Sequence, residues 1–290
     1  MLRIIQKRKY AYAFSGILTV VSIVLIAVWG LNFGIDFKGG TLMEVRFSEG
    51  VTIGAPQAIE HLADLSLNSL TAQPTDGNGM LLRYLASDDG ANEQVLARLK
   101  ALDPSVVQLR TDFIGGSVSE QIKKNALYGI ALSIIGIALY IAWAFRRVSG
   151  IVTSWEYGLG AVIALAHDII IVIGLFVLLG HYWGIEIGVP FVAALLTILG
   201  YSVNDTIVVY DRVRENLLRA HRGEDFEVTV NRSLNETLGR SINTSMTVII
   251  TLIAIVLFGG ESIKYFGVAL LAGVVFGTYS SIYIASALLV

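Results

Sequence analysis

Six long apolar runs constrain what this chain can fold into. Each is close to the roughly 20 apolar residues that an α-helix needs to cross the hydrocarbon core of a bilayer. The runs lie at about Ala11–Leu31, Ala126–Phe145, Tyr157–Leu179, Val189–Tyr210, Ile242–Phe258 and Tyr265–Val290. Only 15% of the residues are charged, against about 25% in an ordinary soluble domain. We therefore predict a polytopic α-helical membrane protein with six transmembrane helices.

Basic residues predict the direction of the spans, because Lys and Arg gather in the short loops on the cytoplasmic side. With six spans, the basic segments Arg3–Lys9, Arg146–Arg147 and Arg212–Arg240 all fall on one side. The short loops on the other side, residues 181–188 and 259–264, carry a single lysine between them. Both termini are therefore predicted to be cytoplasmic. The first span is too long for the apolar part of a signal peptide and is read as a retained anchor.

Residues 32–124 are predicted to form an extracytoplasmic α+β domain between the first two spans, residues 1–31 and 125–290 being the membrane part. Its strand and helix patterns follow the order β-α-β-β-α-β, which is typical of the ferredoxin-like unit. The strands are expected at Thr41–Phe47, Ser69–Gln73, Met80–Ala86 and Val106–Thr111, and the helices at Gly54–Leu65 and Glu93–Leu102. We interpret Asp36, Gly39 and Gly40 as a hinge or tight turn where the domain leaves the membrane.

Ionisable side chains inside the spans carry most of the functional argument, since each costs about 2.5–3.5 kcal/mol at the bilayer centre on insertion scales. Asn204 and Asp205 lie in the inner half of the fourth span, and Arg240 precedes the fifth. These two spans are antiparallel, so Asp205 can meet Arg240 near the cytoplasmic side. A carboxylate whose arginine partner moves away can exchange a proton. The alternatives are a fixed ion pair, or an arginine that extends to the membrane surface.

Further polar residues are predicted to support this region. Thr244 and Thr247 share a helix face with Arg240. His167 and Asp168 lie near the middle of the third span, but neighbouring positions on a helix do not share a face. We therefore expect these two side chains to point to different surroundings. Residues 224–240 have the apolar spacing of a short amphipathic helix, lying on the membrane surface or against the bundle.

No motif in the sequence indicates enzyme chemistry. The chain has no cysteine, and it contains no H-E-x-x-H, G-x-S-x-G or Walker A sequence. A net charge of −2 gives no reason to expect nucleic-acid binding. We expect neither an enzyme nor a metal or cofactor site, and membrane lipid as the main surroundings.

Four segments resemble the SecD/SecF family of protein-export membrane proteins, within the resistance-nodulation-division superfamily. They are Phe33–Thr41, His167–Asp168, Tyr201–Asn216 and Ser233–Ser245. The segment Tyr201–Asn216 is long and specific for the SecF-like members, whereas Phe33–Thr41 alone would also suit SecD. The resemblance extends from one end of the chain to the other.

The resemblance implies a role in bacterial protein export at the inner membrane. It implies pairing with SecD, work beside the SecYEG channel and the ATPase SecA, and use of the proton-motive force to complete preprotein translocation on the outer face. It also assigns the family's transmembrane acid to Asp205 and its transmembrane arginine to Arg240, which favours a proton relay. Two alternatives stay open: an ion-coupled transporter subunit of the same superfamily, and a passive assembly subunit.

Overall fold

The computed structural model describes residues 2–51, 53–65, 67–75, 77–85, 89–146, 153–219 and 224–290. The chain divides into two compact units, one made of Met1–Asn32 and Ala126–Val290 and the other of Phe33–Asn125. Arg147 and residues 220–223, which belong to the basic segments used to predict the orientation, lie outside the described residues.

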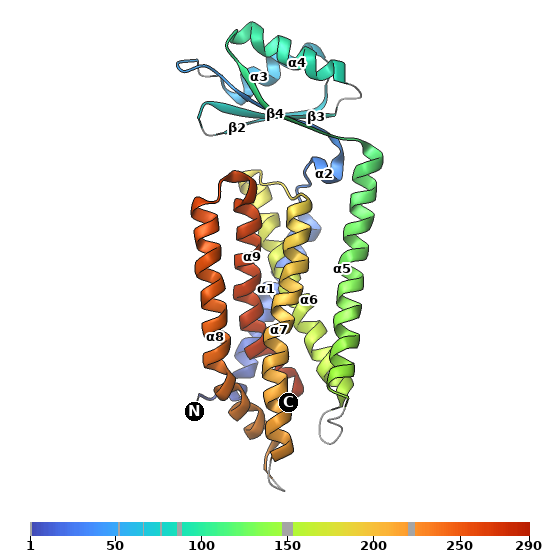
Figure 1. Cartoon of the computed structure of the whole chain (residues 1–290), viewed down its shortest axis with the longest axis vertical. Coiled ribbons are helices and arrows are strands. Elements are labelled where there is room, and N and C mark those ends of the chain that lie inside the picture. The colour runs from blue at the N-terminus through green and yellow to red at the C-terminus, as the bar shows by residue number, and fades with distance from the viewer. Residues whose placement is uncertain are drawn as a thin grey trace. The chain divides into compact units, whose positions relative to one another are not determined.

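The first unit contains six helices that are long and apolar enough to cross a membrane, counted over the described residues (Figure 1). They are α1 (Arg8–Val28), α5 (Gly116–Ala144), α6 (Ser154–Trp183), α7 (Val189–Arg219), α8 (Phe226–Phe258) and α9 (Glu261–Ser280). After α9 the chain continues through a π-helical turn, Ser281–Ala285, and a 3₁₀ turn, Ala287–Leu289. The predicted six-helix membrane fold is confirmed.

The segment at residues 224–240 does not form a separate short helix. It is the first part of α8, which begins at Phe226 after an N-cap by Asp225 and runs without a break into the fifth span. Its apolar positions Val230 and Leu234 are buried against α7 and the N-terminal residues. Of the two placements considered from the sequence, the structure therefore shows packing against the bundle.

The N-terminal residues are held against α8 by two asparagine side chains. Asn231 Oδ1 accepts hydrogen bonds from the amides of Ile4 at 2.8 Å and Ile5 at 3.2 Å. Asn235 Oδ1 accepts one from the Leu2 amide at 2.7 Å, and both asparagines donate to the Leu2 carbonyl. Ile4 and Ile5 are themselves buried among apolar side chains of α7 and α8. These contacts hold the residues that precede α1 against the first turns of α8.

Helices α6, α7 and α9 form the buried centre of the bundle. In the most apolar window of each, 56%, 44% and 50% of the residues are buried, against 17%, 6% and 17% in α1, α5 and α8. Small residues let α9 approach α7 closely: a Cβ on Gly273 would overlap the side chain of Ile198, and one on Gly277 would lie 3.0 Å from Ser202 Cβ. Close packing through small residues is the usual way in which membrane helices associate.

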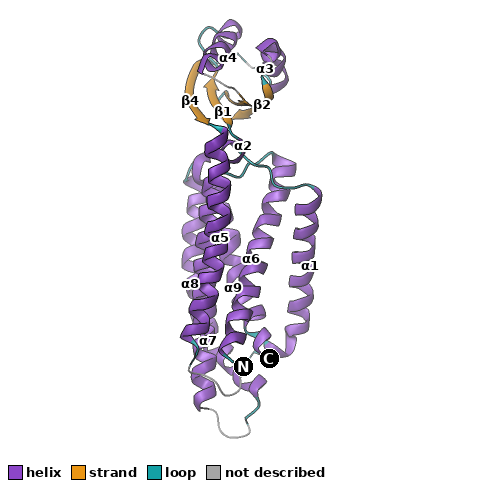
Figure 2. Ribbon diagram, turned by 90° about the vertical axis from the view of Figure 1, so that its right-hand side faces the viewer, coloured by secondary structure: helices purple, strands orange, loops and turns teal. Residues whose placement is uncertain are grey.

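The second unit is a four-stranded antiparallel sheet with helices on one face (Figure 2). The sheet order is β2-β3-β1-β4, which is the arrangement of a ferredoxin-like β-α-β-β-α-β unit. Its elements are α2 (Ile35–Lys38), β1 (Gly40–Arg46), α3 (Ala55–Leu62), β2 (Asn68–Thr75), β3 (Gly79–Leu85), α4 (Asp89–Leu102) and β4 (Val107–Ile114). Met43 and Val45 on β1 pack under Leu62 on α3 and Leu99 on α4. The predicted antiparallel domain between the first two spans is confirmed.

A tight turn joins α2 to β1, at the place where the sequence suggested a hinge or turn. Gly39 has φ +76° and Gly40 has φ +114°, both in the region that L-residues rarely adopt. A Cβ on Gly40 would lie 2.8 Å from the carbonyl oxygen of Tyr84 on β3. Asp36 lies in the first turn of α2, next to the buried Phe37. The two glycines therefore allow β1 to begin its pairing with β3 immediately after the helix.

A buried polar centre as the candidate functional site

Asp168 lies at the centre of the bundle and its side chain is completely buried. One carboxylate oxygen, Oδ2, accepts hydrogen bonds from Ser202 Oγ on α7 at 2.6 Å and from Ser280 Oγ on α9 at 2.8 Å. The other, Oδ1, lies 2.9 Å from His167 Nδ1. A single carboxylate on α6 thus joins three helices by hydrogen bonds.

His167 contacts its neighbour Asp168, although the helix geometry predicted different surroundings for the two side chains. The imidazole reaches the carboxylate of the next residue through Nδ1, while Nε2 is buried and has no hydrogen-bond partner in the described part of the chain. The imidazole ring lies 6.4 Å from the ring of Tyr279 on α9. Tyr279 in turn donates to the Ala11 carbonyl at 3.2 Å and accepts from Ser15 Oγ at 3.3 Å. The polar centre therefore extends from α6 to α1.

Asp205 forms a second buried carboxyl group, about one helical turn beyond Ser202 on α7. Its side chain is 8% exposed, and the hydroxyl groups of Ser241 on α8 and Ser281 after α9 lie close to it. The atom Oδ2 nevertheless makes no hydrogen bond among the described residues, and neither does Ser241 Oγ. Thr206, the next residue, is hydrogen-bonded to Ser281 at 2.9 Å. Asp205 is thus surrounded by hydroxyl groups but not fully paired.

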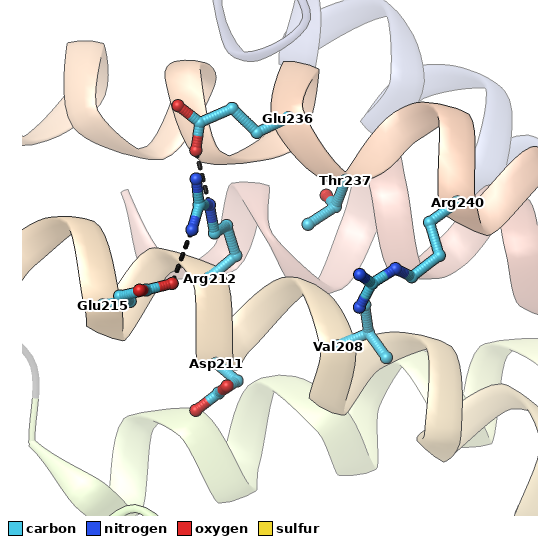
Figure 3. A pocket seen from close by; sticks show the side chains of 7 residues that line it. All are labelled: Val208, Asp211, Arg212, Glu215, Glu236, Thr237 and Arg240. Carbon is cyan, nitrogen blue, oxygen red and sulfur yellow. Dashed lines mark hydrogen bonds and ion pairs between the residues drawn. The ribbon is translucent and has the colours of Figure 1, made fainter.

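The structure does not bring Asp205 and Arg240 together as an ion pair. Arg240 is exposed, and it has no ion pair with any acidic residue that the structure describes. It instead lines a pocket of about 310 Å³ between α7 and α8, where its side chain reaches toward Val208 (Figure 3). The pocket is also lined by Asp211, Arg212, Glu215, Glu236 and Thr237.

The pocket follows the helix face on which Asp205 lies. Val208 and Arg212 are three and seven residues beyond Asp205, which places them on the same stripe of α7. Arg212 is paired with Glu215 at 2.5 Å and with Glu236 on α8 at 2.6 Å (Figure 3). Its charge is therefore satisfied by two carboxylates. Arg240 is the cation of this pocket that has no carboxylate partner among the described residues.

The polar face of α8 that the sequence indicated points away from the bundle. Thr244 and Thr247 do share a face with Arg240, as their spacing predicted, but all three side chains are exposed. The face that packs against α7 and α9 lies one position further along and carries Ser241 and Ser245. Asn204 is also exposed, on the outer side of α7. These residues therefore do not line the buried centre.

Several functional candidates were missed at the sequence level. Ser245 Oγ accepts from Tyr201 on α7 at 3.0 Å and lies 2.5 Å from Thr278 Oγ1 on α9, so hydroxyl groups join α7, α8 and α9. Ser280 and Ser281 stand where α9 widens into the π-helical turn. Such turns are frequent at functional sites. The signal for them was weak, because Ser281 also continues a row of small residues typical of helix packing.

The described residues contain no group of three or more His, Asp or Glu side chains that can hold a metal ion. The buried carboxyl groups have hydroxyl and imidazole neighbours, which can donate hydrogen bonds to them. Fold and site together define the class: a multi-pass membrane protein whose helix bundle encloses two carboxyl groups in a hydroxyl-lined centre. Buried ionisable residues within apolar helices make this centre the candidate functional site.

Comparison with known families gives the more particular assignment. Residues 94–290 match the family described as "Protein export membrane protein SecD/SecF, C-terminal", and residues 24–51 match the "SecD/SecF GG Motif". The protein translocase subunit SecF of Thermobaculum terrenum is 42% identical over 100% of this chain and 93% of its own length. That of Haemophilus influenzae is 36% identical over 97% of this chain and 83% of its own length. The chain therefore belongs to the SecD/SecF family of protein-translocase subunits.

Solved structures of SecDF agree with this assignment. The crystal structure of SecDF from Thermus thermophilus matches 98% of this chain at 32% identity, with a TM-score of 0.84. SecDF in a super-membrane-facing form matches 99% of the chain at 32% identity, with a TM-score of 0.67. The chain spans 37% and 38% of the lengths of these two SecDF chains.

Proposed function

We propose that the chain is the SecF-type half of a Sec export assembly and pairs with a SecD subunit. Its similarity to SecF subunits along its whole length supports this role, and so does the longer SecDF chain, in which the matching region is only a part. The assembly works beside SecYEG and SecA on an exported preprotein. It lies in the bacterial inner membrane with both termini cytoplasmic, as the basic residues in the loops indicate.

The proton-motive force drives this assembly through Asp205. The observation that carries the proposal is the buried Oδ2 atom of Asp205, which has no hydrogen-bond partner in the described chain. An ionised carboxylate left in that position would be costly, so the group either takes up a proton or gains a partner by movement. The pocket that contains Arg240 is lined by residues on the same stripe of α7, beginning with Val208, one turn beyond Asp205.

Arg240 acts as the partner that Asp205 gains and loses. In this structure the guanidinium of Arg240 lies in the pocket beside Val208, which is three residues beyond Asp205 on α7, and it forms no ion pair with Asp205 (Figure 3). Loss of the proton would draw Arg240 toward Asp205 and shift α8 against α7. One charge that crosses 100 mV supplies about 2.3 kcal/mol, enough to bias such a two-state arrangement.

The movement of the bundle is passed to the extracytoplasmic domain, which holds or releases the emerging preprotein. No enzyme site is needed for this role, since the work is done by proton movement and helix packing. Gly39 and Gly40 form the tight turn through which the chain enters the first strand of this domain.

Export of a preprotein into membrane vesicles tests the proposal. The vesicles contain SecYEG, SecD and either the wild-type chain or Asp205→Asn, and export is measured with SecA, with and without a proton-motive force. Asp205→Asn should assemble normally and lose the force-dependent part of export. Asp64→Asn, on an exposed side chain of the extracytoplasmic domain, is the matched control. Unchanged force-dependent export by Asp205→Asn would reduce the chain to a passive assembly subunit.

A further inference from the structure

The His167–Asp168 pair lies on a different helix from Asp205, yet hydroxyl groups connect the two regions. Ser202, which donates to Asp168, is about one turn before Asp205 on α7. The carbonyl oxygen of Ser202 accepts from Thr206 Oγ1 at 3.1 Å and from Ser281 Oγ at 3.4 Å. Ser281 also lies close to the Asp205 carboxyl group. The two buried acids thus lie at the two ends of one cluster of hydroxyl groups.

The hydrogen bonds around His167 fix where a proton can enter. A carboxylate only accepts, so when Asp168 is ionised the hydrogen between the two side chains belongs to His167 Nδ1. The other imidazole nitrogen, Nε2, is then an acceptor, and it is buried with no partner among the described residues. His167 is 7% exposed, so Nε2 has little contact with bulk water in this arrangement of the helices. Nε2 is therefore the open proton-accepting position of the cluster.

We propose that His167 and Asp168 form a second proton-holding pair that works in series with Asp205. This inference rests on the proposed proton-driven function. A proton that binds Nε2 makes an imidazolium, which passes its Nδ1 proton to Asp168 Oδ1. The products are a neutral imidazole that carries its hydrogen on Nε2 and a neutral carboxylic acid. The pair has then gained one proton in all: Nε2 keeps the incoming proton, and the Nδ1 proton has crossed the contact of 2.9 Å to the carboxyl group.

The charge on Asp168 also sets the packing of three helices. As a carboxylate it accepts from Ser202 on α7 and Ser280 on α9, and hydrogen bonds to a charged acceptor are roughly twice as strong as those between neutral groups. Protonation of Asp168 therefore loosens α7 and α9 from α6. Because α7 carries Asp205, protonation of the His167–Asp168 pair changes the surroundings of Asp205.

The titratable neighbours of the pair are few in the described structure. Tyr279 faces His167 from α9, and Asp205 lies beyond Ser202 on α7. From α1 the hydroxyl of Ser15 joins the network through Tyr279, and it does not titrate in the relevant range. A pH dependence that follows Asp168 can therefore be separated from Asp205 by substitution.

Proton flow tests the proposal in vesicles that contain the chain with SecD, SecYEG and SecA during preprotein export. A pH-sensitive dye trapped inside reports the flow for wild type, Asp168→Asn, Asp168→Glu and Asp205→Asn. Asn keeps the size of Asp168 and still accepts from Ser202 and Ser280, but it cannot hold the proton. We expect Asp168→Asn to lower the flow by about 100-fold, the low end for loss of a proton-transferring group. Asp168→Glu should restore part of it.

The outcomes separate this inference from the proposed function. If Asp168→Asn assembles and its proton flow and pH profile equal those of wild type while Asp205→Asn has lost the flow, the pair is only structural and the proposed function stands. If Asp205→Asn also retains full flow, the proposed function fails. Should Asp168→Asn not assemble, His167→Gln decides, since it retains a polar side chain that does not titrate. An unchanged pH profile for His167→Gln would overturn the proposal.

Discussion

Replacement of Gly273 by alanine should push α9 away from α7, because the two helices are in close contact at this position. An added Cβ at this position would overlap Cγ1 and Cδ1 of Ile198 and would lie 2.8 Å from its Cγ2. Ile198 is 1% exposed and belongs to the main apolar core, so its side chain has little room to turn away. The strain therefore falls on the separation of the two helices.

The size of the effect follows from two opposing contributions. Overpacking by one carbon in a close-packed core costs about 1–3 kcal/mol, while alanine is favoured over glycine inside a helix by about 1 kcal/mol. Gly273→Ala should therefore range from neutral to about 2 kcal/mol destabilising by these values. Gly200→Ala on α7 is the matched control, because no atom lies within 4 Å of its added Cβ. Gly200→Ala should be stabilised by the helix preference of alanine over glycine, with no cost from overpacking.

The assay is thermal unfolding of the purified chain in one detergent at one scan rate. The midpoint of Gly273→Ala should fall several degrees below that of Gly200→Ala, as expected for a difference of about 1–3 kcal/mol. In the double variant with Ile198→Ala, the alanine at 273 should cost nothing further, since the overlapping atoms are gone. Equal midpoints for Gly273→Ala and Gly200→Ala would refute the close contact between α7 and α9.

Three further predictions concern the N-terminal residues and the α+β domain of residues 33–125. Asn231→Ala removes the acceptor of the buried Ile4 and Ile5 amides, so it should destabilise the chain by about 1–3 kcal/mol and expose the N-terminus to protease; equal digestion rates would contradict this. Gly40→Ala combines φ +114° with a Cβ 2.8 Å from a backbone oxygen, and the domain should lose hydrogen-exchange protection at β1 unless this turn is formed differently. The Ser48 amide holds the pKa of Asp103 below its usual range. The stability that results is present above the unfolded pKa and is lost as pH falls through the folded pKa. Asp103→Asn should therefore remove this loss of stability at acid pH. An unchanged pH profile of the thermal midpoint would show that Asp103 does not contribute to the pH dependence of stability.

The sequence predicted the fold well because two strong patterns define it. Apolar runs long enough to cross a bilayer identify membrane helices, and the order β-α-β-β-α-β identifies the sheet topology. The helix ends were less predictable, since hydropathy marks only the apolar part of a helix. Helix α7 continues to Arg219, well past the end of its apolar run, and α8 begins at Phe226, well before its apolar run starts.

The buried centre was only partly predictable, for reasons of helix geometry. Spacing placed Arg240, Thr244 and Thr247 on one face of α8 but did not determine which face turns inward. Ser241 and Ser245, one position along from Arg240 and Thr244, took the inward place. The contact between His167 and Asp168 was also not foreseen, because Nδ1 of an imidazole can reach the next carboxylate although the two Cβ atoms diverge. A hydroxyl donor from a distant part of the sequence, such as Ser280, cannot be inferred from the spacing of residues within one helix.

Movement of the extracytoplasmic domain in response to a proton-motive force tests the central claim most directly. The chain has no cysteine, so Glu60→Cys on the domain and Phe258→Cys at the exposed end of α8 can be spin-labelled specifically in vesicles that also contain SecD. We predict that the distribution of distances between the labels shifts when the force is applied and that Asp205→Asn abolishes the shift. A shift of the same size in Asp205→Asn would contradict proton coupling through Asp205.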